Sequence, residues 1–143
     1  TSFTVEFSDP SRRTLWLTDY ENNRNWLMTG VWKSEDGGQN WERKVQMTHA
    51  TGVSIDPSNP DYIFASGMYQ LDGNWGNGGQ FFSKDGGETW KKNMTPTLQQ
   101  NSRHVLVDQT NPNNVFYTYF GGGILKGPNP ARKPAGLDLQ TVR

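Results

Sequence analysis

Short apolar runs separated by turn residues extend along the whole chain. Residues 53–65 and 105–117 each contain an alternating apolar run, an Asp followed by turn-forming residues, and a second apolar run. Residues 5–17 repeat the same order in a fainter form. Period-two alternation bounded by Gly, Pro, Asn and Asp is typical of β-strands joined by tight turns. The pattern therefore predicts an all-β chain.

An eight-residue pattern occurs twice, at Ser34–Trp41 and at Ser83–Trp90. In each copy the glycines tolerate positive φ and the Asp carboxylate accepts hydrogen bonds from backbone N–H groups. Each copy thus predicts a tight turn between two strands, whose Trp opens the next strand and packs against a neighbouring unit. A calcium loop is disfavoured because it needs several carboxylates and the pattern has one fixed position for them. The fixed positions are Ser34, Asp36, Gly38, Trp41, Ser83, Asp85, Gly87 and Trp90.

The spacing of these repeats predicts the architecture. A repeat of about fifty residues made of short strands is typical of a β-propeller, in which each repeat forms one blade. We expect about three four-stranded blades, at residues 1–48, 49–100 and 101–130. Proline and asparagine follow the third strand of the last unit in place of the octet, so its fourth strand is expected to be missing or altered. Residues 131–143 are expected to form an irregular tail or a ring-closing strand.

Three blades do not close a ring, because propellers have about 4–8 of them. The remaining blades are expected from the same protein, from a partner chain or from self-assembly, since open blade edges expose unpaired backbone groups. The sequence begins with Thr1 in place of Met, and its first residues are not expected to be a signal peptide. We favour a segment of a larger propeller protein, with a small self-assembling ring as the alternative.

Both octets resemble the Asp-box, or bacterial neuraminidase repeat, written S-x-D-x-G-x-x-W, and match it at every fixed position. Asp-boxes occur in sialidases, xyloglucan-hydrolysing glycoside hydrolases, sortilin-like receptors and photosystem assembly factors. The resemblance implies a propeller whose Asp-box turns lie on the face away from the active site. It leaves the activity open, because one fold hosts many functions.

Composition narrows the classes of function. The chain has no Cys, which excludes a disulfide scaffold and a thiolate metal site. Its formal net charge is zero, so nucleic acid binding has little electrostatic support. No apolar run approaches the roughly 20 residues of a membrane span. We expect an extracellular or secreted protein without a cofactor. We also expect no metal site, because the two His residues are not spaced as metal ligands.

The loops on the face opposite the octets are the expected site. Residues 19–29 and 68–78 are long and rich in aromatic and amide groups. A carbohydrate presents hydroxyls at its edge and apolar C–H faces, which flat aromatics flanked by amides, carboxylates and Arg complement, and long loops often carry function. The expected substrate-binding residues are Tyr20, Arg24, Trp26, His49, Tyr69, Trp75 and Arg103.

Glycoside hydrolysis requires two carboxylates across the scissile bond, about 5–5.5 Å apart for retention or 6.5–9.5 Å for inversion. Asp19 and Asp72 are the catalytic candidates, with Glu21 also on the predicted loop face. The alternative interpretation of Asp19 is a residue that caps its loop through an Asx turn. The preferred function is a polysaccharide-acting glycoside hydrolase of the kind that the resemblance implies.

Two other functions stay open. A non-catalytic propeller that binds glycans or peptides, like a lectin or a sortilin-like receptor, needs no catalytic pair. A polysaccharide lyase needs a cation, a base and an acid, and these are present as His49, Tyr69, Arg103 and His104. A sialidase is disfavoured, because it needs a cluster of Arg residues on the substrate carboxylate.

Overall fold

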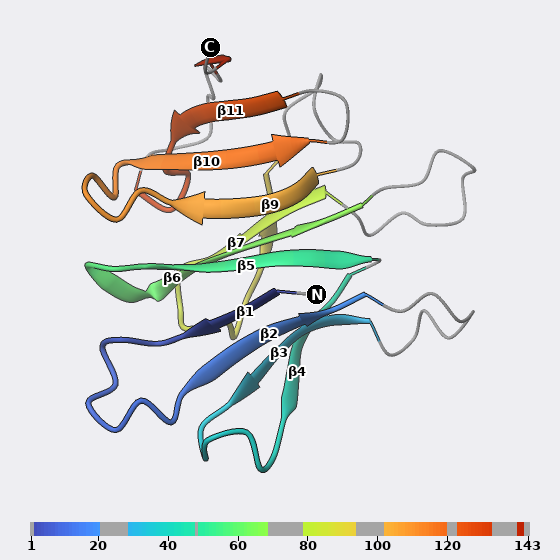
Figure 1. Cartoon of the computed structure of the whole chain (residues 1–143), viewed down its shortest axis with the longest axis vertical. Coiled ribbons are helices and arrows are strands. Elements are labelled where there is room, and N and C mark those ends of the chain that lie inside the picture. The colour runs from blue at the N-terminus through green and yellow to red at the C-terminus, as the bar shows by residue number, and fades with distance from the viewer. Residues whose placement is uncertain are drawn as a thin grey trace.

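A computed structural model describes the chain over residues 2–20, 29–47, 49–68, 79–93, 102–119, 123–132 and 140–141. Within these residues every regular element is a β-strand, and the strands form three antiparallel sheets of four strands each (Figure 1). No helix in the described ranges is long and apolar enough to cross a membrane.

Sheet 1 contains β1 (Ser2–Val5), β2 (Leu15–Asp19), β3 (Gly30–Ser34) and β4 (Glu42–Gln46), in that order. Each strand pairs with the next along the chain, so the sheet is a simple meander. Leu17 lies opposite Phe3 on one side and Trp32 on the other. These residues form one cross-strand apolar row on a single face of the sheet.

Sheet 2 repeats this order with β5 (Ala50–Asp56), β6 (Asn59–Gly67), β7 (Gly79–Ser83) and β8 (Lys91–Lys92). Its first two strands are almost entirely buried at the end nearer residue 67. Such continuous burial fits a strand that is covered on both faces. Sheet 2 is accordingly the central sheet of the three in Figure 1.

Sheet 3 contains β9 (Ser102–Val107), β10 (Asn114–Tyr119), β11 (Gly123–Pro128) and the two-residue β12 (Gln140–Thr141). β12 pairs with β11 through Leu125 and Lys126. The fourth position, which the sequence predicts to be missing or altered, is thus occupied by a very short strand from the C-terminal tail.

The first strands of the three sheets, β1, β5 and β9, lie side by side, and each sheet extends outward from its first strand (Figure 1). Two apolar cores fill the spaces between sheets. The core between sheets 1 and 2 consists of Trp16, Val31, Met47, Ala50, Val53, Ile63 and Ala65. The core between sheets 2 and 3 consists of Phe64, Phe82, Val105, Val107, Val115, Tyr117, Tyr119, Leu125 and Ala131. The chain therefore forms three consecutive blades of a β-propeller, as its repeats predict.

The first octet forms a tight turn between β3 and β4. Ser34 Oγ donates to Asp36 Oδ1 at 2.8 Å and accepts from Gly38 N at 2.8 Å. The Asp36 carboxylate also accepts from Asn40 N at 2.9 Å, and Trp41 Nε1 donates to the Gly38 carbonyl at 3.0 Å. Gly38 has φ +90°, a value that favours Gly. Every fixed position of the octet thus has a local bonding or conformational role.

The second octet, between β7 and β8, repeats these bonds. Ser83 Oγ donates to Asp85 Oδ1 at 2.7 Å and accepts from Gly87 N at 2.9 Å. Asp85 accepts from Thr89 N at 2.8 Å, and Trp90 Nε1 donates to the Gly87 carbonyl at 2.9 Å. Trp90 also packs against the core between sheets 1 and 2. The positions that the two octets share therefore produce the same turn twice.

The two ends of the sheets carry different connections. β3–β4 and β7–β8 are joined by the octets at one end, which we call the octet face. At the other end β2, β6 and β10 finish and the strands that follow them, β3, β7 and β11, begin. We call this end the loop face. The drawn strands run between these two ends, and β10 points toward the loop face (Figure 1).

Candidate functional site

Asp19 lies at the loop face as the last residue of β2, where it pairs with Gly30. The sequence predicts a strand over residues 14–18 with Asp19 directly after it, whereas the observed strand of the same length is shifted by one residue and includes Asp19. Its side chain is half-buried. A carboxylate at the end of a paired strand has a rigid backbone support, which suits a group that must hold a fixed position.

Tyr20 and His49 meet at the loop face between sheets 1 and 2. Their ring centroids are 4.8 Å apart and the ring planes are tilted by 53°. Tyr20 follows β2 directly, whereas His49 immediately precedes β5. Tyr20 also follows Asp19 in the chain, so the two predicted binding residues meet one position along the chain from the predicted catalytic one.

The backbone at His49 is unusual. His49 has φ +48°, which is uncommon for a residue other than Gly. Its carbonyl accepts a hydrogen bond from Met68 N at 3.1 Å, which links the residue before β5 to the residue after β6. Burial lowers the pKa of the His49 imidazole below its usual value, so the ring is neutral near pH 7. A neutral, half-buried ring held in this way is a fixed flat surface.

Arg103 and His104 lie near the start of β9. The register of β9 with β10 shifts between Thr118 and Tyr119, so that His104 pairs with Thr118 while Ser102 pairs with Tyr119. Arg103 is the extra residue of this irregularity and is half-buried, whereas His104 is exposed. The lyase hypothesis thus has its His and Arg residues on two different sheets, with Tyr69 outside the described residues.

Several predicted residues lie outside the described part of the chain. They belong to the long loops 19–29 and 68–78 that the sequence analysis selects. These residues are Arg24, Trp26, Tyr69, Asp72 and Trp75. Asp19, Tyr20, His49 and Arg103 are therefore the predicted catalytic and binding residues that the structure places.

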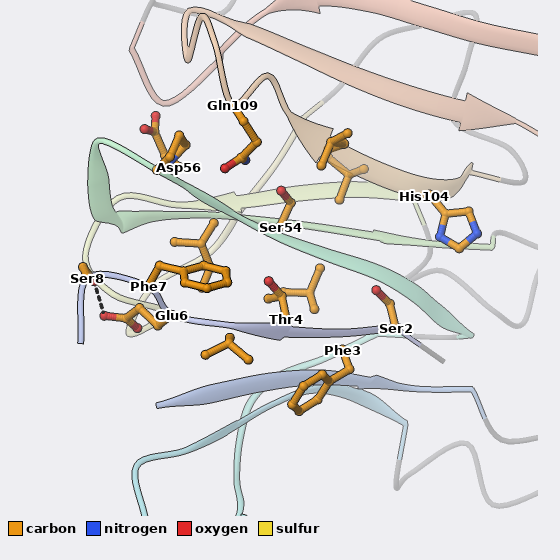
Figure 2. Close-up of a pocket in the computed structure, with 16 residues that line it drawn as sticks. Ser2, Phe3, Thr4, Glu6, Phe7, Ser8, Ser54, Asp56, His104 and Gln109 are labelled. Carbon is orange, nitrogen blue, oxygen red and sulfur yellow. Dashed lines mark hydrogen bonds between the residues drawn. The ribbon is translucent and has the colours of Figure 1, made fainter. Parts of the chain in front are cut away.

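A groove of about 610 Å³ runs along the first strands β1, β5 and β9 (Figure 2). Thr4, Ser54, His104 and Phe7 are among the residues that line it. Ser54 Oγ accepts a hydrogen bond from Val107 N at 3.1 Å, so this polar group already joins sheet 2 to sheet 3. The sequence analysis does not predict the groove, although hydroxyl residues among the apolar positions of the first strands were a signal for it.

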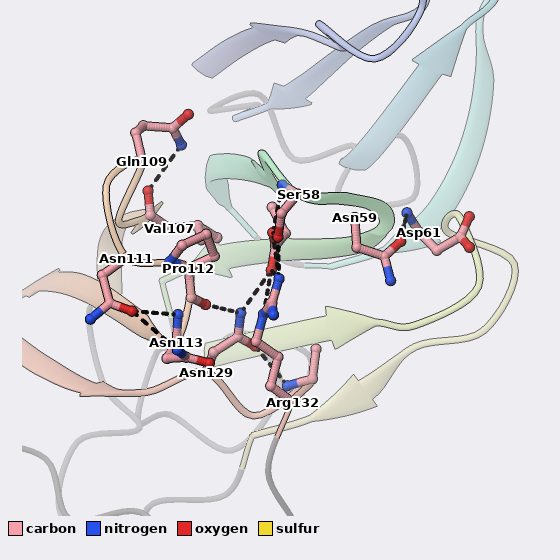
Figure 3. A network of polar contacts seen from close by, with 12 residues as sticks. Ser58, Asn59, Asp61, Val107, Gln109, Asn111, Pro112, Asn113, Asn129 and Arg132 are labelled. Carbon is pink, nitrogen blue, oxygen red and sulfur yellow. Dashed lines mark hydrogen bonds and ion pairs between the residues drawn. The ribbon is translucent and has the colours of Figure 1, made fainter.

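The most buried charge of the described residues belongs to a network at the octet face (Figure 3). Asp56 is 1% exposed and accepts from Arg132 Nε at 2.9 Å, Arg132 Nη2 at 3.0 Å and Asn129 Nδ2 at 3.1 Å. Burial acts to raise the pKa of Asp56, but the bonds from Arg132 and Ser58 outweigh it and hold that pKa below its usual value. This network joins sheet 2 to the segment after β11, and every charge in it is paired, which favours a structural role.

No group of three or more His, Cys, Asp or Glu residues that could hold a metal ion occurs in the described ranges.

Comparisons with known proteins identify the fold. No family model matches the chain and no curated protein matches it. The crystal structure of a Niastella koreensis GH74 enzyme aligns with a TM-score of 0.64 and 20% identity over 90% of this chain and 22% of its own. An ancestral GH74 enzyme aligns with a TM-score of 0.65 and 19% identity over 99% of this chain and 18% of its own.

A third similar structure is of YCF48 rather than of a GH74 enzyme. YCF48 bound to D1 peptide aligns with a TM-score of 0.57 and 17% identity, over 89% of this chain and 35% of its own. The chain thus spans about a fifth of the GH74 enzymes and about a third of YCF48. At these identities the likeness establishes a shared propeller fold.

Proposed function

We propose that the chain is a segment of an extracellular carbohydrate-active propeller, and that the protein is a glycoside hydrolase acting on a polysaccharide. The observation that carries the proposal is the Tyr20–His49 ring pair beside Asp19 at the loop face. GH74 enzymes with the same fold support this class. The remaining blades supply the rest of the site.

We further propose that the two octets are Asp-boxes. The support is that the Ser, Asp, Gly and Trp positions of the S-x-D-x-G-x-x-W pattern make the same hydrogen bonds in both copies. In proteins that the pattern resembles, the Asp-box lies away from the active site. This arrangement supports the choice of the loop face, where Asp19, Tyr20 and His49 lie.

Each residue has a proposed role. Tyr20 and His49 offer a flat aromatic surface to the apolar C–H face of a sugar, and the neutral His49 ring costs little to desolvate. Asp19 is one of the two carboxylates that hydrolysis requires, and Asp72 is the candidate for the second. Trp26, Trp75, Arg24, Tyr69 and Arg103 are proposed to extend the binding surface.

Peptide binding is the second candidate function. The observation that favours it is that YCF48, with the same fold, has a structure bound to D1 peptide. In that case the loop face would bind an extended peptide and Asp19 would have no catalytic role. The two candidates differ in their response to a single substitution at Asp19.

The experiment uses the complete protein chain and a panel of soluble polysaccharides and their oligosaccharides. We expect release of reducing ends, a fall in kcat of about 10²-fold or more for Asp19→Asn, and a loss of about tenfold in glycan affinity for Tyr20→Ala. Glu35→Gln, which changes an exposed carboxylate at the octet face, is the matched control.

Three results would count against these proposals. An Asp19→Asn variant with full activity would remove Asp19 from catalysis. Glycan binding without hydrolysis would favour a lectin. A protein that binds neither glycan nor oligosaccharide would reject the carbohydrate proposal, and titration with extended peptides would then test the second candidate.

A further inference from the structure

Four buried polar atoms lack a hydrogen-bond partner within the part of the chain that the structure describes. They are Ser66 Oγ, Gln80 Nε2, Ser102 Oγ and Tyr119 OH. Ser66 and Ser102 are 0% exposed, Gln80 is 3% and Tyr119 is 8%. A buried polar group without a partner is costly, and native proteins contain few of them. Four such groups therefore require an explanation.

Two of the four atoms come from sheet 2, at the loop face. Ser66 of β6 and Gln80 of β7 are direct cross-strand partners, so their side chains lie on the same face of the sheet. Asn93, just after β8, donates from Nδ2 to Gln80 Oε1 at 3.2 Å and from its backbone N to the Gln80 carbonyl at 2.8 Å. The Gln80 amide oxygen is thus satisfied, and its NH₂ group remains a donor.

The other two atoms come from sheet 3, at the same end. Ser102 of β9 and Tyr119 of β10 are also direct partners in the sheet. Tyr119 belongs to the core between sheets 2 and 3, so its side chain faces sheet 2. Burial raises the pKa of Tyr119 well above its usual value, which keeps the phenol protonated. Its OH group is therefore available as a donor or an acceptor.

The two pairs lie close to each other across the space between the sheets. A Cβ atom at Gly52 would lie 2.6 Å from Ser66 Oγ and 3.0 Å from the Cα of His104, so β5 and β9 approach closely beside Ser66. Thr51 Oγ1 bonds both the Ser66 carbonyl at 3.2 Å and the Ser102 carbonyl at 3.1 Å. We call the set of Ser66, Gln80, Ser102 and Tyr119 the polar seam.

Asn93 provides a second link across this space. Its side chain bonds Gln80 in sheet 2 and also the phenol of Tyr117 in sheet 3. Tyr117 lies two residues before Tyr119 on the same strand, with its side chain on the same face. The equivalent space between sheets 1 and 2 is filled by an apolar core that includes Met47, Ala50 and Ala65. The polar seam is thus particular to sheets 2 and 3.

We propose that the polar seam binds neutral hydroxyl groups at the loop face. Gln80 Nε2 only donates, so the guest must accept at least one hydrogen bond, while the two Ser hydroxyls and the Tyr119 phenol can either donate or accept. None of the four seam side chains is charged, and a buried ion without a countercharge would be strongly disfavoured. A neutral O–H group, which both accepts and donates, fits this set of atoms, and it would be supplied by ordered water or by a hydroxyl of a bound carbohydrate. The carbohydrate source rests on the proposed function.

Crystal structures of the complete protein, grown with and without a soluble oligosaccharide, test the proposal and separate the two sources. We expect ordered solvent oxygen within hydrogen-bond distance of at least two of the four atoms. Displacement of that oxygen by a sugar hydroxyl would identify the carbohydrate source, and an unchanged oxygen would identify water. A seam that is dry, or filled by a protein side chain, would overturn the proposal.

Thermal unfolding of Tyr119→Phe supplies a second test. The expected change in Tm depends on whether the phenol bonds a hydroxyl guest or has no partner. If the phenol bonds a hydroxyl guest, its removal should lower Tm by about 3 °C. If the phenol is an unsatisfied group, its removal should leave Tm unchanged or raise it, which would contradict the proposal. Tyr117→Phe is the matched control, because Tyr117 bonds Asn93 and its loss should lower Tm in either case.

Failure of the carbohydrate proposal leaves a different signature. A protein that neither binds nor cleaves glycans, but has ordered water in the seam and a lowered Tm in Tyr119→Phe, would retain the seam as an internal hydration site. Loss of both signals would reject the seam regardless of the activity of the protein.

Discussion

The two octets have the same local bonds but different surroundings. In the second octet a Cβ atom at Gly87 would lie 2.5 Å from Trp16 Cη2 of sheet 1, and Glu88 bonds Lys44 Nζ of the same sheet at 2.8 Å. In the first octet the nearest neighbours of a Cβ atom at Gly38 would be Leu15 and Trp41, at 3.6 Å, which is ordinary van der Waals contact. The octet sequence determines the turn, whereas the position of the blade in the array determines what the turn packs against.

The third blade shows a different solution at the same end of the sheet. The segment after β11 has no octet, and Asn129 and Arg132 bond the buried Asp56 of sheet 2 instead. The guanidinium of Arg132 also lies over the Tyr62 ring, 5.9 Å from its centroid. The Asp56–Arg132 ion pair thus joins blades 2 and 3 at this end. Blades 1 and 2 are instead joined by the second octet, whose Gly87 packs against Trp16.

The largest effect is expected from the pair Gly87→Ala and Gly38→Ala. Both glycines have φ +90°, which costs a residue with a Cβ about 1–2 kcal/mol. Gly87→Ala adds overpacking against Trp16, worth about 1–3 kcal/mol, so we expect a total loss of about 3 kcal/mol against about 1 kcal/mol for Gly38→Ala. Denaturant unfolding of the complete chain measures both. Equal losses in the two variants would show that the close approach of Gly87 to Trp16 adds nothing to the cost of Gly87→Ala.

The octets were predictable from the sequence because their bonds connect residues within eight positions. The strand, Asp turn and strand order of each unit and the three sheets were predictable from the repeats, whereas the two-residue β12 occupies a fourth position that was expected to be missing or altered. The Asp56–Arg132 pair and the polar seam were not predictable, because they depend on which sheet faces which. Ser66 and Ser102 are unremarkable in the sequence, and only the packing of β5 against β9 gives them a shared environment.

The next effect concerns the ion pair of the third blade. Arg132→Leu leaves the Asp56 carboxylate buried with fewer partners. Loss of one partner from a fully buried pair costs about 3–5 kcal/mol, and because the Arg132 side chain is 27% exposed we expect about 2 kcal/mol. Arg13→Leu is the control, because Arg13 is exposed and its guanidinium donates to the Asp36 carbonyl at the first octet without pairing with a buried charge. A similar loss of stability in both variants would show that the burial of Asp56 does not make the ion pair of the third blade stronger than the exposed bond at the first octet.

The effect of acid is expected to be smaller and to act on both octets alike. The hydroxyl of Thr89, its backbone N–H and the hydroxyl of Ser83 lower the pKa of Asp85 to about 2, and the backbone and side chain of Asn40 with Ser34 likewise lower the pKa of Asp36. A pKa that is lower in the folded state contributes stability that is complete above about pH 4 and is lost as pH falls toward 2. Tm measured from pH 5 to pH 2 should fall, and Asp85→Asn should flatten that fall. An unchanged slope in Asp85→Asn would assign the acid sensitivity to other carboxylates.

The smallest effect is expected at the ion pair between the second octet and sheet 1. Lys44 Nζ lies 2.8 Å from Glu88 and 2.9 Å from Glu42, and both carboxylates are well exposed. Solvent screens such pairs, so Lys44→Met should cost at most about 0.5 kcal/mol, because the Met retains the apolar stem that packs beside Gly87. Glu35→Gln, which removes an exposed pair with Lys33 beside the first octet, serves as the reference. If Lys44→Met cost as much as Gly87→Ala, charge rather than the close approach to Trp16 would hold the second octet against sheet 1, and the two octets would differ in their ion pairs rather than in their packing.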